Sequence, residues 1–270
     1  PTGPAPAGNP GDVVYLVSSG VAGAASDVVY TGSGNLYVSN SLTTGNIFAS
    51  PIVNVTQNRR FVAVSAGSPG SVYSDDGITW YTSTIPTGLN LSAVTFSSLT
   101  GRFVTMVENS NSALYSDDGN TWVTTTLPIS DYWNSVTCSP VTGRFVAVSF
   151  PSFSSQAVYS DNGVTWNQTT LPSYGSFVSY WTGITCSPQT GRFVLITNGS
   201  ASMGYSNDGV SWNLSTFPSN SGWFSVTCSA LTGRFVAVGS YSTAAAYSDD
   251  GITWNPSTPA RPWPRYPTAW

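Results

Sequence analysis

The 270-residue sequence contains no histidine, no lysine and a single glutamate, and charged residues make up only 7% of it. Ordinary globular proteins carry roughly 25%. The absence of histidine removes the most common general base and a frequent metal ligand. The net charge of −4 excludes the basic face that nucleic-acid-binding proteins present, so we expect no nucleic-acid partner.

Long apolar runs are also missing: none approaches the roughly 20 residues of a membrane-spanning helix, so we expect no membrane insertion. The three cysteines do not follow a metal-ligand spacing such as C-x₂-C, and we predict no metal and no cofactor. The chain is nevertheless 40% apolar and 13% aromatic, which is enough to fold around a core. Uncharged serine, threonine, asparagine and glycine supply its polar surface.

What the sequence does contain is an eight-residue box that occurs five times, first as Tyr73-Ser-Asp-Asp-Gly-Ile-Thr-Trp80. The box serines follow one another at steps of 42, 44, 46 and 42 residues. Tyr30 to Tyr37 forms a degenerate sixth copy. The box residues predicted to be structural are Ser74, Asp76, Gly77, Trp80, Ser116, Asp118, Gly119, Trp122, Ser160, Asn162, Gly163, Trp166, Ser206, Asp208, Gly209, Trp212, Ser248, Asp250, Gly251 and Trp254.

Two further motifs travel with the box. Val-Thr-Cys-Ser or a close variant begins at Val94, Val136, Ile184 and Val226, nine residues before the phenylalanine of a second motif, Arg-Phe-Val. The arginines of that second motif are Arg60, Arg102, Arg144, Arg192 and Arg234. With few other cations in the chain, we expect these structural arginines to bond carboxylates or carbonyls within or between repeats, with the box aspartate as the ionic partner.

Each repeat is predicted to form four short strands, because its β-branched and aromatic runs are bounded by turn residues. The Asp-Gly or Asn-Gly of each box is typical of a tight hairpin turn. Repeats of 40–45 residues with four strands are typical of propeller blades. We therefore predict an all-β, six-bladed β-propeller of four-stranded antiparallel blades over residues 12–270, closed by pairing N- and C-terminal strands (Val13–Val17 and Thr268–Trp270).

The boxes resemble the Asp boxes, or bacterial neuraminidase repeats, of sialidase-like propellers. The family form is Ser-x-Asp-x-Gly-x-Thr-Trp. Aligned on glycine and tryptophan, the first box places Tyr73 and Asp75 at the serine and aspartate positions, whereas a shorter form uses Ser74 and Asp76. The sequence alone does not distinguish between these two alignments. The resemblance implies that the boxes are structural.

Sialidases of this fold use three arginines, a tyrosine activated by a glutamate, and an aspartate. Five of the eight arginines here belong to the repeats, which leaves Arg59, Arg261 and Arg265, and the only glutamate is Glu108. We therefore predict a non-catalytic member with no catalytic residues. The alternative is a secreted glycan-active enzyme, a sialidase-like glycoside hydrolase.

Aromatic residues before the first strands form the candidate ligand-binding surface. Each of three tryptophans stands three residues before the inner-strand valine or isoleucine, with other aromatics beside it. They would emerge together on one face and stack on sugars, or else pack between blades. The candidate residues are Trp133, Trp181, Trp223, Tyr132, Tyr180 and Phe224.

The function predicted from these features is a non-enzymatic extracellular or virion-surface module, part of a fibre or appendage. Its expected partner is a glycan or a neighbouring structural protein subunit, and a pure assembly scaffold is a further alternative. Residues 1–11 are rich in proline and glycine and resemble a linker or stalk end, through which the chain could form a homo-oligomer.

Overall fold

The computed structural model describes residues 28–31, 35–38, 60–67, 70–150, 156–172, 181–198, 200–239 and 244–257. The chain divides into two compact units, Pro1–Asn58 and Arg59–Trp270. All regular structure in the described ranges is β-strand. A search of the same residues finds no helix long and apolar enough to cross a membrane.

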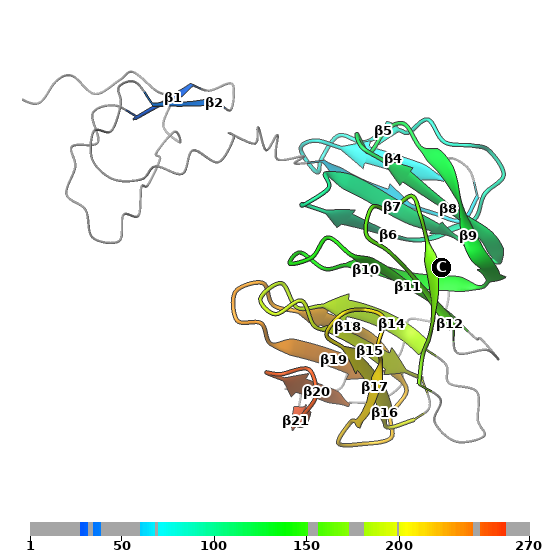
Figure 1. Ribbon diagram of the computed structural model, residues 1–270, viewed down its shortest axis with the longest axis vertical. Coiled ribbons are helices and arrows are strands. Elements are labelled where there is room, and N and C mark those ends of the chain that lie inside the picture. Colours follow the sequence, from blue (N-terminus) through cyan, green and yellow to red (C-terminus); the bar gives the residue numbers. More distant parts are fainter. Residues whose placement is uncertain are drawn as a thin grey trace, which may run out of the picture. The chain divides into compact units, whose positions relative to one another are not determined.

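Five antiparallel sheets make up the described part of the second unit, and we call them blades 1 to 5 in chain order (Figure 1). Blade 1 has three described strands and each other blade has four, laid side by side in sequence order. Blade 1 contains β3 (Phe61–Val64), β4 (Ser71–Ser74) and β5 (Tyr81–Thr82). Blade 2 contains β6 (Leu91–Ser97), β7 (Arg102–Val107), β8 (Ser110–Ser116) and β9 (Val123–Asp131).

Blades 3 to 5 repeat this plan. Blade 3 contains β10 (Trp133–Cys138), β11 (Phe145–Ser149), β12 (Gln156–Ser160) and β13 (Asn167–Thr170). Blade 4 contains β14 (Trp181–Cys186), β15 (Phe193–Thr197), β16 (Ser202–Ser206) and β17 (Asn213–Thr216). Blade 5 contains β18 (Trp223–Cys228), β19 (Phe235–Gly239), β20 (Ala245–Ser248) and β21 (Asn255–Ser257). The predicted four-stranded antiparallel repeat is therefore confirmed for blades 2 to 5.

The degenerate sixth copy forms a different hairpin. In the first unit, β1 (Val28–Thr31) pairs with β2 (Asn35–Val38), and Tyr30 faces Leu36. The equivalent Tyr115 of blade 2 pairs with Val123, so the two paired residues are separated by two more residues than Tyr30 and Leu36 are. The hairpin is thus shorter than a box. Five blades are described rather than six, and both strands predicted to close the ring lie outside the described residues.

The hydrophobic core lies between consecutive blades. Val104 and Met106 of blade 2, for example, share one buried cluster with Phe145 and Ala147 of blade 3. The second strands of blades 2, 3 and 4 are buried on both faces, as the patterns of β7, β11 and β15 show. This explains why Phe-Val-Ala-Val runs are apolar throughout and do not alternate.

First strands of neighbouring blades lie against one another, since β10 contacts both β6 and β14, and β14 contacts β18. Side-chain amide and hydroxyl groups join them: Asn134 Nδ2 donates to the Thr182 carbonyl at 2.9 Å, and Thr182 Oγ1 donates to the Trp223 carbonyl at 2.8 Å. The Val-Thr-Cys strands are therefore the inner strands, as the propeller prediction requires.

Box glycines are required for two physical reasons. Gly163 has a φ of +72°, which residues with a side chain rarely adopt. A Cβ placed on it would also lie 2.8 Å from Val104 Cγ2 and 3.1 Å from Arg102 Cδ, both in the preceding blade. Gly77 of blade 1 has the same backbone at φ +75°, but its nearest neighbour is Phe61 of its own blade at 3.5 Å.

This pair of glycines separates backbone strain from blade contact. Gly77→Ala is expected to cost about 1–2 kcal/mol of unfolding free energy from its positive φ alone. Gly163→Ala is expected to cost a further 1–3 kcal/mol or so, because the methyl group overpacks the junction. Urea denaturation of both variants in dilute solution measures the difference. Equal losses would show that the close approach of the blades contributes nothing.

Candidate functional site

Each box turn is closed by its serine and by the acid two residues later. In blade 1, Gly77 N donates to Ser74 Oγ at 2.8 Å, and Ser74 Oγ donates to Asp76 Oδ1 at 2.9 Å. Asp76 Oδ1 also accepts from the backbone amides of Ile78 and Thr79, both at 2.7 Å. The other boxes repeat the pattern, with Asn162 in place of aspartate in blade 3. The shorter alignment, on Ser74 and Asp76, is therefore correct.

The acid immediately after the serine has a separate role. Asp75 accepts a bidentate pair of bonds from Arg60, 2.7 Å from Nε and 3.0 Å from Nη2. Arg192 meets an amide instead, the Asn207 Oδ1 at 2.8 Å. The hypothesis that a box acid is the arginine's ionic partner is confirmed for four of the five repeats. The remaining ion pairs are Arg102–Asp117, Arg144–Asp161 and Arg234–Asp249.

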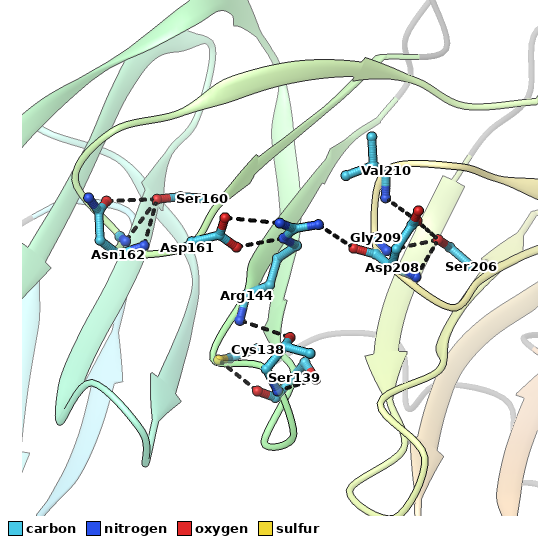
Figure 2. A network of polar contacts seen from close by, with 12 residues as sticks. Cys138, Ser139, Arg144, Ser160, Asp161, Asn162, Ser206, Asp208, Gly209 and Val210 are labelled. Atoms are coloured by element: carbon cyan, nitrogen blue, oxygen red, sulfur yellow. Dashed lines mark hydrogen bonds and ion pairs between the residues drawn. The ribbon is translucent and has the colours of Figure 1, made fainter.

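The same guanidinium also reaches the next blade. Figure 2 shows Arg144 between Asp161 of its own blade and the backbone carbonyl of Asp208 in blade 4, to which its Nη1 donates at 2.8 Å. The guanidinium carbon lies 4.9 Å from the centre of the Tyr159 ring. We call this three-way contact the arginine clamp. The equivalent cross-blade bonds of the other clamps join Arg60 to the Asp118 carbonyl, Arg102 to the Asn162 carbonyl and Arg192 to the Asp250 carbonyl.

A hydroxyl on the outer strand makes a second bond across each junction. Thr125 Oγ1 donates to the Val164 carbonyl at 2.6 Å, and Thr169 Oγ1 donates to the Val210 carbonyl at 2.7 Å. These hydroxyl residues are not among those predicted from the sequence. The signal was present, because every box tryptophan is followed three positions later by a hydroxyl residue: Ser83, Thr125, Thr169, Ser215 and Ser257.

Hydrogen bonds within the boxes hold the turn carboxylates ionised. Bonds from the backbone amides of Thr79 and Ile78 lower the pKa of Asp76 to about 2. At Asp208, burial opposes ionisation, yet amide bonds from Ser211 and Val210 still lower the pKa to about 2. These charges are therefore fixed across the physiological pH range.

The three candidate tryptophans are not exposed, so they do not form a ligand-binding face, and the alternative that they pack between blades is confirmed. Trp133, Trp181 and Trp223 are 0%, 1% and 0% exposed and lie in the cores between blades. A β-bulge follows each of them, between Trp133 and Ser135 in blade 3, for example. The bulge changes the direction of the side chain, so the indole turns into the junction.

Two other candidate aromatics are exposed. Tyr132 and Phe224 flank the buried tryptophans at the end of the blades opposite the box turns. A hydrogen bond to Glu108 raises the pKa of the Tyr132 hydroxyl. Tyr180 lies outside the described residues. We call this end, with Tyr132, Phe224 and Glu108, the opposite face, and the end that carries the box turns the box face.

Two hollows in the described surface are small. One pocket of about 230 Å³ is lined by Gly67, Gly70, Ser83 and the segment 85–89 of blade 1. Another, of about 270 Å³, lies against the box of blade 2. Among the described residues, no group of three or more cysteines and acids is placed to hold a metal ion.

The three cysteines are free thiols. Cys138 and Cys186 are buried and Cys228 is partly buried. Desolvation raises the pKa of Cys138 to about 11 and that of Cys186 to about 12. Thiols that stay protonated in this way are poor nucleophiles and poor metal ligands.

No protein-family model matches the sequence, and no curated protein matches it either. Solved structures do match the fold. Virginiamycin B lyase from Staphylococcus aureus superimposes with a TM-score of 0.60 at 14% identity, over 74% of this chain and 69% of the lyase chain. A structure of YCF48 bound to D1 peptide gives 0.53 at 14% identity, over 73% of this chain and 62% of that one.

A glycoside hydrolase matches in the same way. The GH74 enzyme from Niastella koreensis gives a TM-score of 0.52 at 19% identity, over 72% of this chain and 30% of the enzyme. These relatives share the β-propeller fold with this chain. Because identity is so low and their activities differ, the comparison establishes the fold alone.

The arginine clamp makes a direct prediction. Arg144→Met removes two bonds to a carboxylate and one to the next blade, so we expect a loss of about 1–3 kcal/mol. Thermal unfolding should show the Tm lowered by roughly 3–8 °C. Arg234→Met is the matched control, since its partners among the described residues, Asp249 and Tyr247, both belong to its own blade, and it should lose less. An unchanged Tm for Arg144→Met would contradict the clamp.

The turn carboxylates predict the response to acid. The pKa of Asp208 in the folded chain, about 2, lies below its ordinary value of 3.8, so its ionised form stabilises the fold above pH 4. This contribution is lost as the pH falls from 4 towards 2. Asp208→Asn should be neutral at pH 7, because Asn162 makes the same bonds naturally.

Denaturation curves of this variant at pH 7 and pH 2.5 measure the effect. Between these values the wild type should lose about 1 kcal/mol more than Asp208→Asn, after allowance for solvent screening. Parallel losses would show that Asp208 does not carry this part of the acid response.

Proposed function

We propose that this chain is a non-enzymatic structural and binding module of the Asp-box type, belonging to an extracellular or virion-surface fibre or appendage. The observation that carries the proposal is the use made of its charged groups. In the described blades, each of the five arginines is bonded to a box residue of its own blade. The charged groups of the described blades therefore stabilise the fold.

The opposite face is the proposed binding surface. Tyr132 and Phe224 are exposed there, and aromatic rings stack on the apolar faces of sugars or pack against protein. Glu108 and Asp131 add two carboxylates beside Tyr132. An aromatic surface with few charges suits a glycan or a neighbouring structural subunit, whereas a phosphate-rich ligand would need cations.

The low charge of the chain supports the proposed location. Serine, threonine and asparagine dominate its polar residues, and residues 1–11 have the composition of a linker or stalk end. A stalk would present the propeller as a head and could bring several copies together. In the scaffold alternative, the same loops contact only neighbouring subunits and bind no small ligand.

One observation favours the enzymatic alternative, a sialidase-like hydrolase. Glu108 raises the pKa of the Tyr132 hydroxyl, so the two side chains are neighbours, as a tyrosine nucleophile and its activating glutamate would be. However, Arg102 begins β7 and Glu108 follows the end of that strand. Six strand residues span about 20 Å, so the clamp arginines are too distant to bind the carboxylate of a substrate held at Tyr132.

A glycan-array screen together with a fluorogenic sialoside turnover assay, both on the purified full chain, tests the proposal. We expect selective binding without turnover. Tyr132→Ala and Phe224→Ala should each weaken binding about tenfold or more by removing a stacking surface. Leu99 is exposed on the box face. The Leu99→Ala variant is therefore the matched control and should bind normally.

Turnover that Glu108→Gln abolishes would overturn the non-enzymatic proposal and establish the hydrolase. The absence of both glycan binding and turnover would favour the scaffold alternative. Binding that is unaffected by Tyr132→Ala and Phe224→Ala would place the ligand elsewhere on the molecule.

A further inference from the structure

The four junctions between described blades have the same three parts. The arginine of one blade bonds a box carbonyl of the next, its valine two positions later packs on the box glycine, and its outer-strand hydroxyl bonds a second box carbonyl. Each junction therefore has a donor side, with arginine, valine and hydroxyl, and an acceptor side, the box turn. At every junction, the donor side belongs to the earlier blade in the chain and the acceptor side belongs to the later blade.

Blade 5 is the last blade in the described part of the chain, and its donor side is exposed. The Arg234 side chain is 50% exposed, whereas those of Arg60, Arg102 and Arg144 are 20% to 23% exposed. Val236 is 39% exposed, although the equivalent valines of blades 2 to 4 are fully buried. Ser257, at the position of the bonding hydroxyls, is exposed as well. We call these three residues the donor end.

Blade 1 is the first blade in the described part of the second unit, and its acceptor side is exposed. Ile78 is 84% exposed and Trp80 is exposed, whereas Trp122, Trp166 and Trp254 are buried. Gly77 lacks the valine and arginine contacts that the box glycines of later blades receive. We call Asp75 to Thr79 the acceptor end. Because Phe61, Ile78, Arg234 and Val236 are all exposed, the two ends do not cover each other within this unit.

Charge and shape at the two ends match. The donor end carries a guanidinium, and the acceptor end carries two exposed carboxylates and the carbonyls that accept such a group at the internal junctions. A sixth repeat would match less well, since residues 1–58 contain no arginine and the segment Tyr30–Tyr37 contains no acid. A second copy of this chain supplies all three parts.

We propose that copies of this chain associate head to tail, the donor end of one copy binding the acceptor end of the next. Such a contact uses two different surfaces, so it is heterologous and generates either a closed ring of copies or an extended row. The contact reproduces the internal junction, with Arg234 on the Asp76 carbonyl, Val236 on Gly77 and Ser257 on the following turn carbonyl.

Two variants block the two ends separately. Val236→Glu places a charge at the centre of the donor end, at a position already exposed in the single chain. Gly77→Asn adds a side chain to the acceptor end, and asparagine tolerates the positive φ of this position. Neither substitution meets a covered site in the single chain. Leu99→Glu, exposed on the box face away from both ends, is the matched control.

Sedimentation velocity of the full chain over a range of concentrations tests the contact. The wild type and Leu99→Glu should associate as concentration rises, and Val236→Glu and Gly77→Asn should each weaken association at least about tenfold. An equimolar mixture of the two blocked variants should form dimers and nothing larger, because one intact donor end and one intact acceptor end remain.

Two results would overturn the proposal. A wild type that stays monomeric at every concentration shows that its ends are covered within the chain, as closure by a sixth blade would require. Association that neither variant weakens shows that the copies meet elsewhere. Circular dichroism of each variant confirms that the blades are folded, and glycan binding on the opposite face is unaffected by either result.

Discussion

The bond between a clamp arginine and the carbonyl of the next box holds this fold together. A single guanidinium orients the box of its own blade through a carboxylate, lies over a tyrosine ring and reaches across the junction. Five planar donors in one rigid group make this triple role feasible, and lysine could not fill it. The box turn must accordingly present its carbonyls at a fixed angle, which the serine, the acid and the glycine secure together.

This arrangement explains how a chain with 7% charged residues is stabilised. Almost every charge in the described blades lies on the box face and is neutralised or bonded there. The opposite face is left with Glu108, Asp131 and exposed aromatics. Under the proposed function, structural and recognition tasks are separated to the two ends of the strands, so the loops of the opposite face can vary without weakening the junctions.

A repeat architecture also creates a problem at its ends. Each blade covers the blade before it, so a series that does not close leaves one donor side and one acceptor side exposed. The exposed Val236 and Ile78 mark these two sides. The contact that stabilises the interior of the array therefore also determines what the ends can bind, whether that is another part of the chain or another copy of it.

The sequence by itself determined the repeat, the strands, the hairpin turn and the class of partner for Arg144, because all of these depend on neighbouring residues and on a spacing of about 44 residues. It left open whether Asp75 or Asp76 closes the turn, and whether Trp133 lies on an exposed face or packs between blades. Only the tertiary structure decided these points. The bonds of Asp76 stay within its own turn and those of Asp75 go to Arg60 of the same blade, whereas the covered side of a bulged strand depends on a blade that lies some 40 residues away in the chain and in direct contact in space.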